Sequence, residues 1–175
     1  HPTGAERVYK VAWGGSSWLG TTGFVAAAME LADQIPTGAA PDVIYAACGT
    51  MGTAAGLSLG CRLAGLSARI QAVQVTPPAV YSENSFQKLF NATNAALHER
   101  DTALPLLENP MLNVDTYTDF YGDGYAIATP QACEAVELIS ETEGLKLETI
   151  RNILNLLGSS RTTSNRIRIE TKMIS

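Results

Sequence analysis

Hydrophobic positions in the first half of the chain alternate between the period of a strand and that of a helix. Residues 8–13 are β-branched and aromatic and are followed by two glycines, which predicts a strand and then a turn. A helix is predicted from Thr21 or Thr22 to Pro36, because apolar residues recur there at helical spacing: Phe24, Ala27, Ala28, Leu31 and Ala32.

Two further strands frame a second helix. Residues 42–48 form a near-continuous apolar run, as expected for a strand buried on both faces of a parallel sheet. A glycine-rich loop at 49–53 leads to a small-residue helix over 54–64, and residues 68–75 alternate like a strand. The βαβαβ order predicts an α/β fold, an open and largely parallel sheet with helices on both faces.

The second half is less regular and contains no internal repeat. Helices are predicted over 84–98 and over 130–143, the latter with Pro130 in its first turn. Residues 101–113 hold two prolines and predict a loop, and residues 117–125 are aromatic and glycine-bearing. The last helix is expected to bury a face made of Ala132, Ala135, Val136, Leu138 and Ile139.

Composition bounds the class of protein. The 175 residues are 46% hydrophobic and 17% charged, which indicates a globular chain and excludes a disordered one. The apolar runs fall short of the 18 residues of a membrane span. The formal net charge of −5 disfavours nucleic-acid and anionic-membrane partners, whose binding needs Lys and Arg.

Cysteine usage bears on location. The three cysteines, Cys48, Cys61 and Cys133, form no CxxC pair and lie in apolar or helix-like runs. We therefore expect buried free thiols in the cytoplasm, with no disulfide and no metal site.

Charge divides the chain at residue 150. Residues 151–175 carry five basic side chains and one acidic, net +4, whereas the remainder is net −9. We interpret 1–150 as an incomplete α/β cofactor-binding domain and 151–175 as a divergent polar, basic tail, solvated or disordered. The chain starts His1-Pro2-Thr3-Gly4 without Met or a signal-peptide pattern, which we interpret as an excised or truncated piece.

The loop at 49–53 carries the clearest chemistry. It follows a buried strand and precedes a helix, whose N-terminus offers unpaired backbone N–H groups and the positive end of a dipole. Gly49 and Gly52 are expected to take positive φ and allow close approach, and Thr50 and Thr53 to add hydroxyl donors. A phosphate is the predicted occupant. The alternative interpretation is a turn whose small residues serve packing.

Two nucleotide-binding classes are disfavoured. No Lys follows as in G-x-x-x-x-G-K-[ST], which argues against a P-loop NTPase. Met51 stands where a second glycine of G-x-G-x-x-G belongs, and no acidic residue closes the next strand, which argues against a Rossmann oxidoreductase.

A second glycine-rich turn covers residues 14–23. It also follows a predicted strand and precedes a helix, so it is expected at the same sheet edge, where ligands collect in open α/β sheets. Ser16 and Ser17 in it are otherwise explained by turn and helix-cap chemistry.

These motifs carry a resemblance to a known family. Residues 14–25 (GGSSWLGTTGFV) resemble the GGSN-x-LG-x-x-GY-V stretch of the D-cysteine desulfhydrase and 1-aminocyclopropane-1-carboxylate deaminase family. Residues 47–57 (ACGTMGTAAGL) are similar to its phosphate loop and to the G-T-x-G-T-x-x-G loop of cysteine synthases. Residues 125–127, followed by Glu-Ala at 134–135 and Glu-Gly at 143–144, match its Y-G-x-P, E-A and E-G positions. All are fold type II (tryptophan synthase β-like) pyridoxal-phosphate enzymes.

The resemblance implies roles for individual residues. Pyridoxal 5′-phosphate would be the cofactor, and its phosphate would be held by backbone N–H groups of Gly49, Thr50, Met51, Gly52 and Thr53. Residues lining the substrate side of the crevice would be Tyr125, Gly15 and Ser16. The complete enzyme, expected as a homodimer, would deaminate or eliminate a small amino acid such as D-cysteine or aminocyclopropane carboxylate, giving a keto acid and ammonia.

The chain also departs from the family. The family's Schiff-base lysine and its carboxylate-binding loop lie upstream of the matched region, and Lys10 is better interpreted as a sheet-surface residue. After residue 144 the chain lacks the D-P-V-Y-[TE]-G-K-like segment that meets the pyridine nitrogen. No catalytic residue is assigned, and this chain alone is expected to be inactive. A non-catalytic phosphate- or nucleotide-binding module is the alternative, and the amino acid and its stereoisomer stay open.

Overall fold

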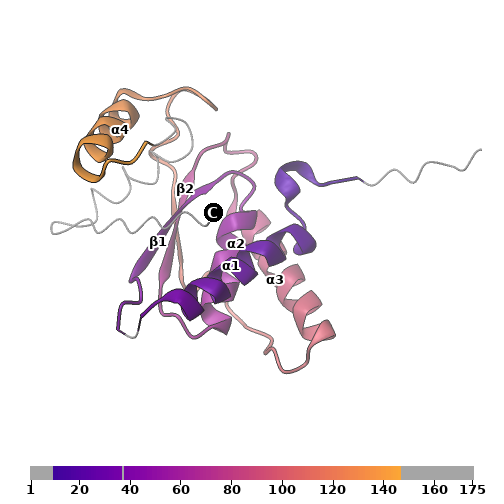
Figure 1. Cartoon of the computed structure of the whole chain (residues 1–175). Coiled ribbons are helices and arrows are strands. Elements are labelled where there is room, and N and C mark those ends of the chain that lie inside the picture. Colours follow the sequence, from indigo (N-terminus) through magenta and orange to yellow (C-terminus); the bar gives the residue numbers. More distant parts are fainter. Residues whose placement is uncertain (1–9, 37, 147–175) are drawn as a thin grey trace, which may run out of the picture.

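The computed structural model describes residues 10–36 and 38–146. After a short 3-10 turn at Trp13–Gly15, the elements follow one another in the order α1 (Trp18–Gln34), β1 (Val43–Cys48), α2 (Gly52–Leu63), β2 (Arg69–Gln74), α3 (Glu83–Arg100), β3 (Val114–Tyr117) and α4 (Pro130–Glu143) (Figure 1). The predicted tail and the boundary at residue 150 lie outside the described residues.

The described strands form one parallel sheet in the order β1-β2-β3. The two adjacent strands predicted from the apolar pattern are confirmed, with Val43 opposite Arg69 and Cys48 opposite Gln74. The third strand was not predicted, because its four residues fall between the proline-bearing segment and the aromatic one. The three carboxyl ends lie at one edge, so the loops that leave them meet there.

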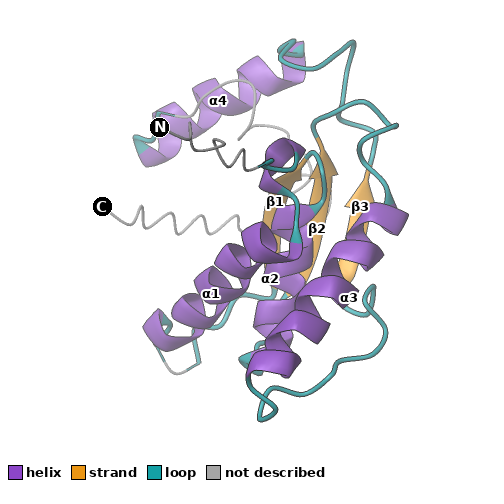
Figure 2. Cartoon of the chain, turned by 90° about the vertical axis from the view of Figure 1, so that its right-hand side faces the viewer, coloured by secondary structure: helices purple, strands orange, loops and turns teal. Residues whose placement is uncertain are grey.

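Helices α1, α2 and α3 lie together on one face of the sheet (Figures 1 and 2). Helix α2 packs directly on β1 and β2, while α1 and α3 pack on α2 and on each other. The core between them includes fully buried Leu59, Ile70, Phe86 and Phe90. The expectation of helices on both faces is therefore met on one face only within the described residues. Helix α4 lies apart from this layer, beyond the carboxyl edge (Figure 2).

Helices α1 and α2 approach unusually closely because glycines line their contact. A Cβ added at Gly60 would stand 2.6 Å from the carbonyl oxygen of Val25 and 2.7 Å from the Cβ of Ala28. Only a glycine fits at such a separation without a backbone shift. The buried residues of α1 are Thr21, Val25 and Ala28, spaced at one helical face, whereas Phe24 and Ala27 of the predicted face are exposed.

The strand predicted at residues 8–13 is wrong for the part that the structure describes. Residues 10–12 belong to no strand, and Trp13 begins the 3-10 turn. Gly14 (φ 64°) and Gly15 (φ 67°) take left-handed conformations, and the amide of Gly15 donates to the carbonyl of Ala12 at 2.8 Å. This turn redirects the chain, so Val11 and Trp13 are each 72% exposed rather than part of a core.

Cysteine states match the sequence in part. All three cysteines are free; Cys48 and Cys61 are buried, as predicted. Cys133 is exposed, which corrects the prediction, because α4 buries only Ala132 and Ile139 on its inner side. Leu138, placed on the buried face of α4 from sequence, is 54% exposed.

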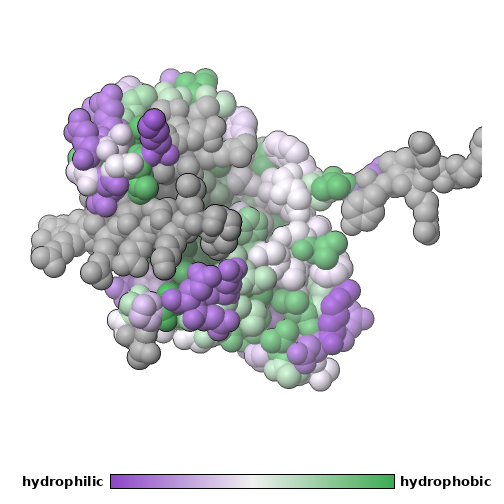
Figure 3. All heavy atoms as spheres, in the orientation of Figure 1, coloured by the Kyte–Doolittle hydropathy of each residue, from purple (hydrophilic) through white to green (hydrophobic). Residues whose placement is uncertain are grey.

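The hydrophilic residues of the surface that Figure 3 shows lie mainly over the ends of the helices. Hydrophilic residues gather over α4, over the carboxyl-terminal end of α1 and over the end of α3, and the surface between the last two is less polar (Figure 3). Within residues 10–36 and 38–146, no helix has the length and apolarity of a bilayer span.

Candidate anion-binding site

Two loops at the carboxyl edge of the sheet touch each other. The hydroxyl of Ser16, just before α1, shares a hydrogen bond with the hydroxyl of Thr50, just before α2. A Cβ at Gly14 would stand 2.7 Å from Thr50 Oγ1, so glycine allows the first loop to lie against the second. The two glycine-rich turns therefore lie side by side, as expected from sequence, although no strand precedes the first of them in the described residues.

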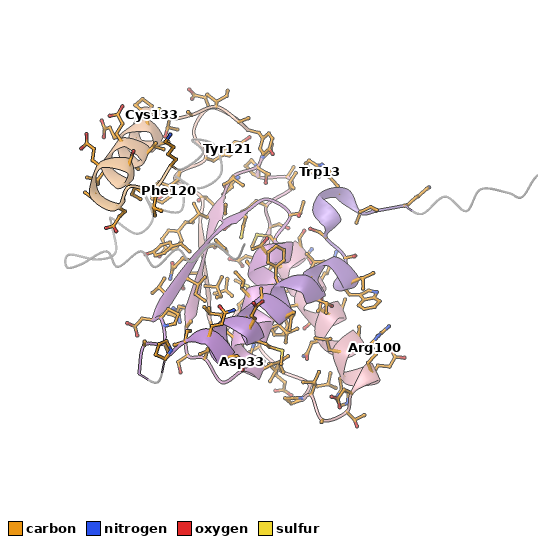
Figure 4. All side chains as sticks on the ribbon, in the orientation of Figure 1. Trp13, Asp33, Arg100, Phe120, Tyr121 and Cys133 are labelled. Carbon is orange, nitrogen blue, oxygen red and sulfur yellow. The ribbon has the colours of Figure 1, made fainter. Side chains whose placement is uncertain are left out.

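The start of α1 is held from two sides. The Oγ of Ser17 caps the helix and accepts a hydrogen bond from the amide of Gly20 at 3.2 Å. The guanidinium carbon of Arg100, at the end of α3, lies 4.4 Å from the ring centroid of Trp18, a cation–π distance. Figure 4 shows Arg100 at that end of α3 and Trp13 at the start of the chain's described part. These contacts fix the loop that carries Ser16.

The loops enclose a small cavity of about 50 Å³. A cavity of roughly 10–15 Å³ already admits one water, so this cavity is large enough for a small group. Its lining comes from both loops and from the first turns of α1 and α2: Gly14, Gly15, Ser16, Gly20, Thr21, Phe24, Cys48, Gly49, Thr50, Met51, Gly52 and Thr53.

The backbone amides of residues 49–53 have no hydrogen-bond acceptor among the described residues. The first helical amide to find a backbone partner across the loop is that of Ala55, which donates to the carbonyl of Met51 at 3.0 Å. Unpaired amides at the N-terminus of a helix point at an anion with the positive end of the helix dipole behind them. The loop is thus not a closed packing turn.

The left-handed residue of this loop is Met51, with φ 68°, and not Gly49 or Gly52 as predicted. The side chain of Met51 is 1% exposed within the core, and this packing offsets the strain of positive φ at a non-glycine residue. Gly52 is already helical and is needed for a different reason. A Cβ there would stand 3.0 Å from Ser16 Oγ and 3.7 Å from Thr21 Oγ1.

No Asp, Glu, Lys or Arg side chain lines the cavity, so its electrostatics come from dipoles. Burial raises the pKa of the Cys48 thiol to about 12, although the amide of Ala54 acts in the opposite direction. The thiol is therefore neutral near pH 7, and the wall that it forms does not repel an anion. Neutral donors in a part-buried site hold an anion without a competing charge.

Thr21 is the polar side chain of this site that the sequence did not single out. It is 1% exposed, and its Oγ1 is fully buried without a hydrogen-bond partner among the described residues. The available signal was its position, the first turn of the helix that follows a glycine-rich loop. Cys48 and Phe24, assigned only to a strand and a helix from sequence, also line the cavity.

The predicted site residues separate into two groups. The loop at 49–53, Gly15 and Ser16 are brought together around the cavity. Tyr125 lies in the segment between β3 and α4, is 53% exposed and does not line the cavity. Its substrate-facing role stays a prediction.

A parallel strand, a glycine-rich loop and a helix N-terminus with free amides form the arrangement that binds phosphate groups in many α/β proteins. The chain belongs to the pyridoxal-phosphate dependent enzyme family, whose pattern matches residues 6–150. Members of this family bind pyridoxal phosphate, and the resemblance inferred from the motifs is thereby confirmed.

Individual relatives sharpen the comparison. The chain is 31% identical over 148 residues to the bifunctional D-cysteine desulfhydrase/1-aminocyclopropane-1-carboxylate deaminase, mitochondrial, of Arabidopsis thaliana. It is 28% identical over 144 residues to a D-cysteine desulfhydrase of Salmonella schwarzengrund. These alignments cover 83% and 82% of the chain. A crystal structure of an ACC deaminase homologue superposes with a TM-score of 0.66 at 26% identity, over 85% of the chain.

The chain spans 34% and 41% of the length of these two relatives and 42% of the solved structure. Over that span the residues present fit the phosphate of the family's cofactor. The free amides, the buried hydroxyl of Thr21 and the close approach at Gly52 form a cradle of donors for an anion.

Proposed function

We propose that this chain forms the phosphate-binding part of a pyridoxal-phosphate-dependent lyase or deaminase. The complete enzyme would act on a small amino acid, of the D-cysteine or aminocyclopropane carboxylate type, and release a keto acid and ammonia. The substrate class comes from the names of the relatives, a desulfhydrase and a deaminase. The observation that carries the proposal is that residues 49–53 all line the cavity and that their five consecutive amides have no acceptor among the described residues.

The chain's own residues bind and orient. The amides of residues 49–53 donate to the phosphate, and the α2 dipole adds to the attraction. The hydroxyls of Ser16 and Thr50, already bonded to each other, close the cavity on the side of the first loop. Bound pyridoxal phosphate supplies an electron-poor ring that accepts the electron pair released at the substrate carbon.

The substrate side is assigned to the same edge of the sheet. We propose that Gly15 and Ser16 line the substrate crevice and that Tyr125 reaches it from the loop after β3. Support comes from the shared edge, since every one of these residues lies on a segment leaving that edge or lining the cavity there. No step of proton transfer is assigned to them.

A second candidate is phosphate binding without catalysis. A nucleophilic amine is needed to exchange substrate onto the cofactor. Lys10, Lys88 and Lys146 are exposed and none lines the cavity, while Lys172 lies outside the described residues. This observation favours a phosphate- or nucleotide-binding role for the chain by itself.

Three further expectations join the proposal. The free thiols favour a reducing compartment such as the cytoplasm. The net charge of −5 argues against nucleic acid as a partner. The family resemblance supports a homodimer for the complete enzyme, which size-exclusion chromatography with light scattering would test.

Titration of the chain with inorganic phosphate and with pyridoxal phosphate by calorimetry tests the proposal. Both ligands should bind and compete with each other. Because the main donors are backbone groups, Thr50→Ala should weaken binding by about 1 kcal/mol, the value of one hydrogen bond. If neither ligand binds, the proposal is refuted. If phosphate and nucleotide bind but pyridoxal phosphate does not, the second candidate is favoured.

A further inference from the structure

The hydroxyl of Thr21 is buried in the cavity wall and is left without a partner. The residue is 1% exposed, and within the described residues nothing donates to its Oγ1 or accepts from it. A buried hydroxyl without a hydrogen bond lowers stability, since it has lost water and gained nothing in return. Because Thr21 also lines the cavity, a ligand bound there could supply the missing partner.

The surroundings of Thr21 indicate which ligand that is. Its Oγ1 stands 3.7 Å from the position that a Cβ of Gly52 would occupy, and Ser16 Oγ stands 3.0 Å from the same position. Gly52 is the first residue of α2, whose free amide belongs to the loop at 49–53. Thr21 thus projects from the first turn of α1 toward the first turn of α2.

We propose that Thr21 is a second-helix ligand of the phosphate group, donating from α1 a hydrogen bond that the loop before α2 cannot supply. The inference rests on the proposed phosphate site. It adds that the anion is held between two helix N-termini, α1 and α2, rather than by one loop alone.

The hydroxyl of Thr21 makes no hydrogen bond within α1, unlike that of the next residue. Thr22, the next residue, donates from its Oγ1 to the carbonyl of Trp18 at 2.8 Å, an ordinary bond within the helix. Thr21 makes no such bond although it stands in the same turn. Its hydroxyl is therefore free to donate to a bound oxygen anion, and a bond to a charged acceptor is stronger than one to a neutral acceptor.

The chain offers a matched control. Thr93, in α3, is also fully buried with an unpartnered Oγ1, and it does not line the cavity. A change of Thr to Val removes the hydroxyl at nearly constant size. Both Thr21→Val and Thr93→Val should therefore raise the melting temperature without phosphate by about 2–4 °C.

Phosphate affinity separates the two variants. Calorimetric titration of the full chain with inorganic phosphate should give an affinity about tenfold lower for Thr21→Val and an unchanged one for Thr93→Val. Thr21→Ser, which keeps the hydroxyl, should remain close to the parent, and Thr21→Ala should lose affinity like Thr21→Val. The stabilisation of the chain by added phosphate should shrink in parallel.

Two failures are distinguishable. If the parent binds phosphate and Thr21→Val binds it equally well, the two-helix site is overturned while the proposed function stands. If the parent does not bind phosphate, the proposed function fails and this inference with it. A lower melting temperature of ligand-free Thr21→Val would also contradict the inference, because the hydroxyl would then have a structural partner.

Discussion

The change Gly52→Val places a side chain in the space assigned to the anion. The Cβ alone would stand 3.0 Å from Ser16 Oγ and 3.7 Å from Thr21 Oγ1, where ordinary contacts begin at 3.4 Å. The two methyl groups of valine extend further into a cavity of about 50 Å³. The side chain and a phosphate cannot both occupy it.

The size of the effect follows from the donors that are blocked. Hydrogen bonds to a charged acceptor contribute about 1.5–3 kcal/mol each. Loss of two of them costs about 3–6 kcal/mol, so Gly52→Val should lower phosphate affinity more than about 100-fold. Gly52→Ala adds only the Cβ, which Ser16 can accommodate by a small shift, and should lower affinity about tenfold. Folding should persist in both, because Gly52 has helical φ and either residue has a higher helix propensity than glycine.

Calorimetry with inorganic phosphate measures the affinities, and thermal unfolding without phosphate checks the fold. Gly23→Val is the matched control, since a Cβ at Gly23 meets nothing within 4 Å and lies in α1 outside the cavity lining. It should leave phosphate affinity unchanged. If Gly52→Val binds phosphate as well as the parent does, the loop is a packing turn and the reasoning about the cradle is wrong.

Three further predictions test the framework around the site. Gly60→Ala should lower the free energy of unfolding, measured by thermal or urea denaturation, by about 1–2 kcal/mol. Overpacking against Val25 should outweigh the gain in helix propensity. A variant more stable than the parent would contradict the close contact between the helices. Mass spectrometry should show that a thiol-alkylating reagent modifies Cys133 alone in the native chain and all three cysteines after denaturation. Burial raises the pKa of the Cys48 and Cys61 thiols and should slow their reaction. Early labelling of these two thiols in the native chain would contradict their burial. The hydrogen bond from Arg69 lowers the pKa of Asp115, so Asp115→Asn should lower the free energy of unfolding by about 0.5–1 kcal/mol at pH 7. This difference should vanish as the pH falls below the unfolded pKa of about 3.9 and through the lowered pKa of the folded chain. A difference between variant and parent that persists in acid would refute the assignment.

The central βαβ unit could be predicted from sequence because its signals are local. The apolar run ending at Cys48 predicted the first described strand, and the helix predicted over 54–64 is observed at Gly52–Leu63. Most residues of α2 are buried, as their small size indicates, whereas β1 buries only Ala46 and Cys48, so the apolar run predicted more burial than this strand has in the described residues.

The errors fall where contacts distant in sequence decide. Trp13 resembles a strand residue by type, yet the left-handed glycines after it turn the chain away from the sheet. The strand at Val114–Tyr117 has only four residues, and pairing with β2 rather than its own pattern defines it. Positive φ falls on Met51 because the core holds its side chain, which glycine statistics do not reveal.

The site could be predicted in its backbone part and not in its side-chain part. Glycines between a strand and a helix predict free amides at residues 49–53. The position of Thr21 after a glycine-rich loop was only a weak signal, since the hydroxyl is left without a partner only once α1 has packed against α2.

Amide chemical shifts during a phosphate titration test the central claim most directly. The account predicts that the ¹H–¹⁵N signals of residues 49–53 move together, saturate with the dissociation constant found by calorimetry, and gain protection from hydrogen exchange. Pyridoxal phosphate should move the same five signals. If phosphate binds while these signals stay in place, or if all signals stay in place at saturating phosphate, the assignment of this loop as the phosphate cradle is contradicted.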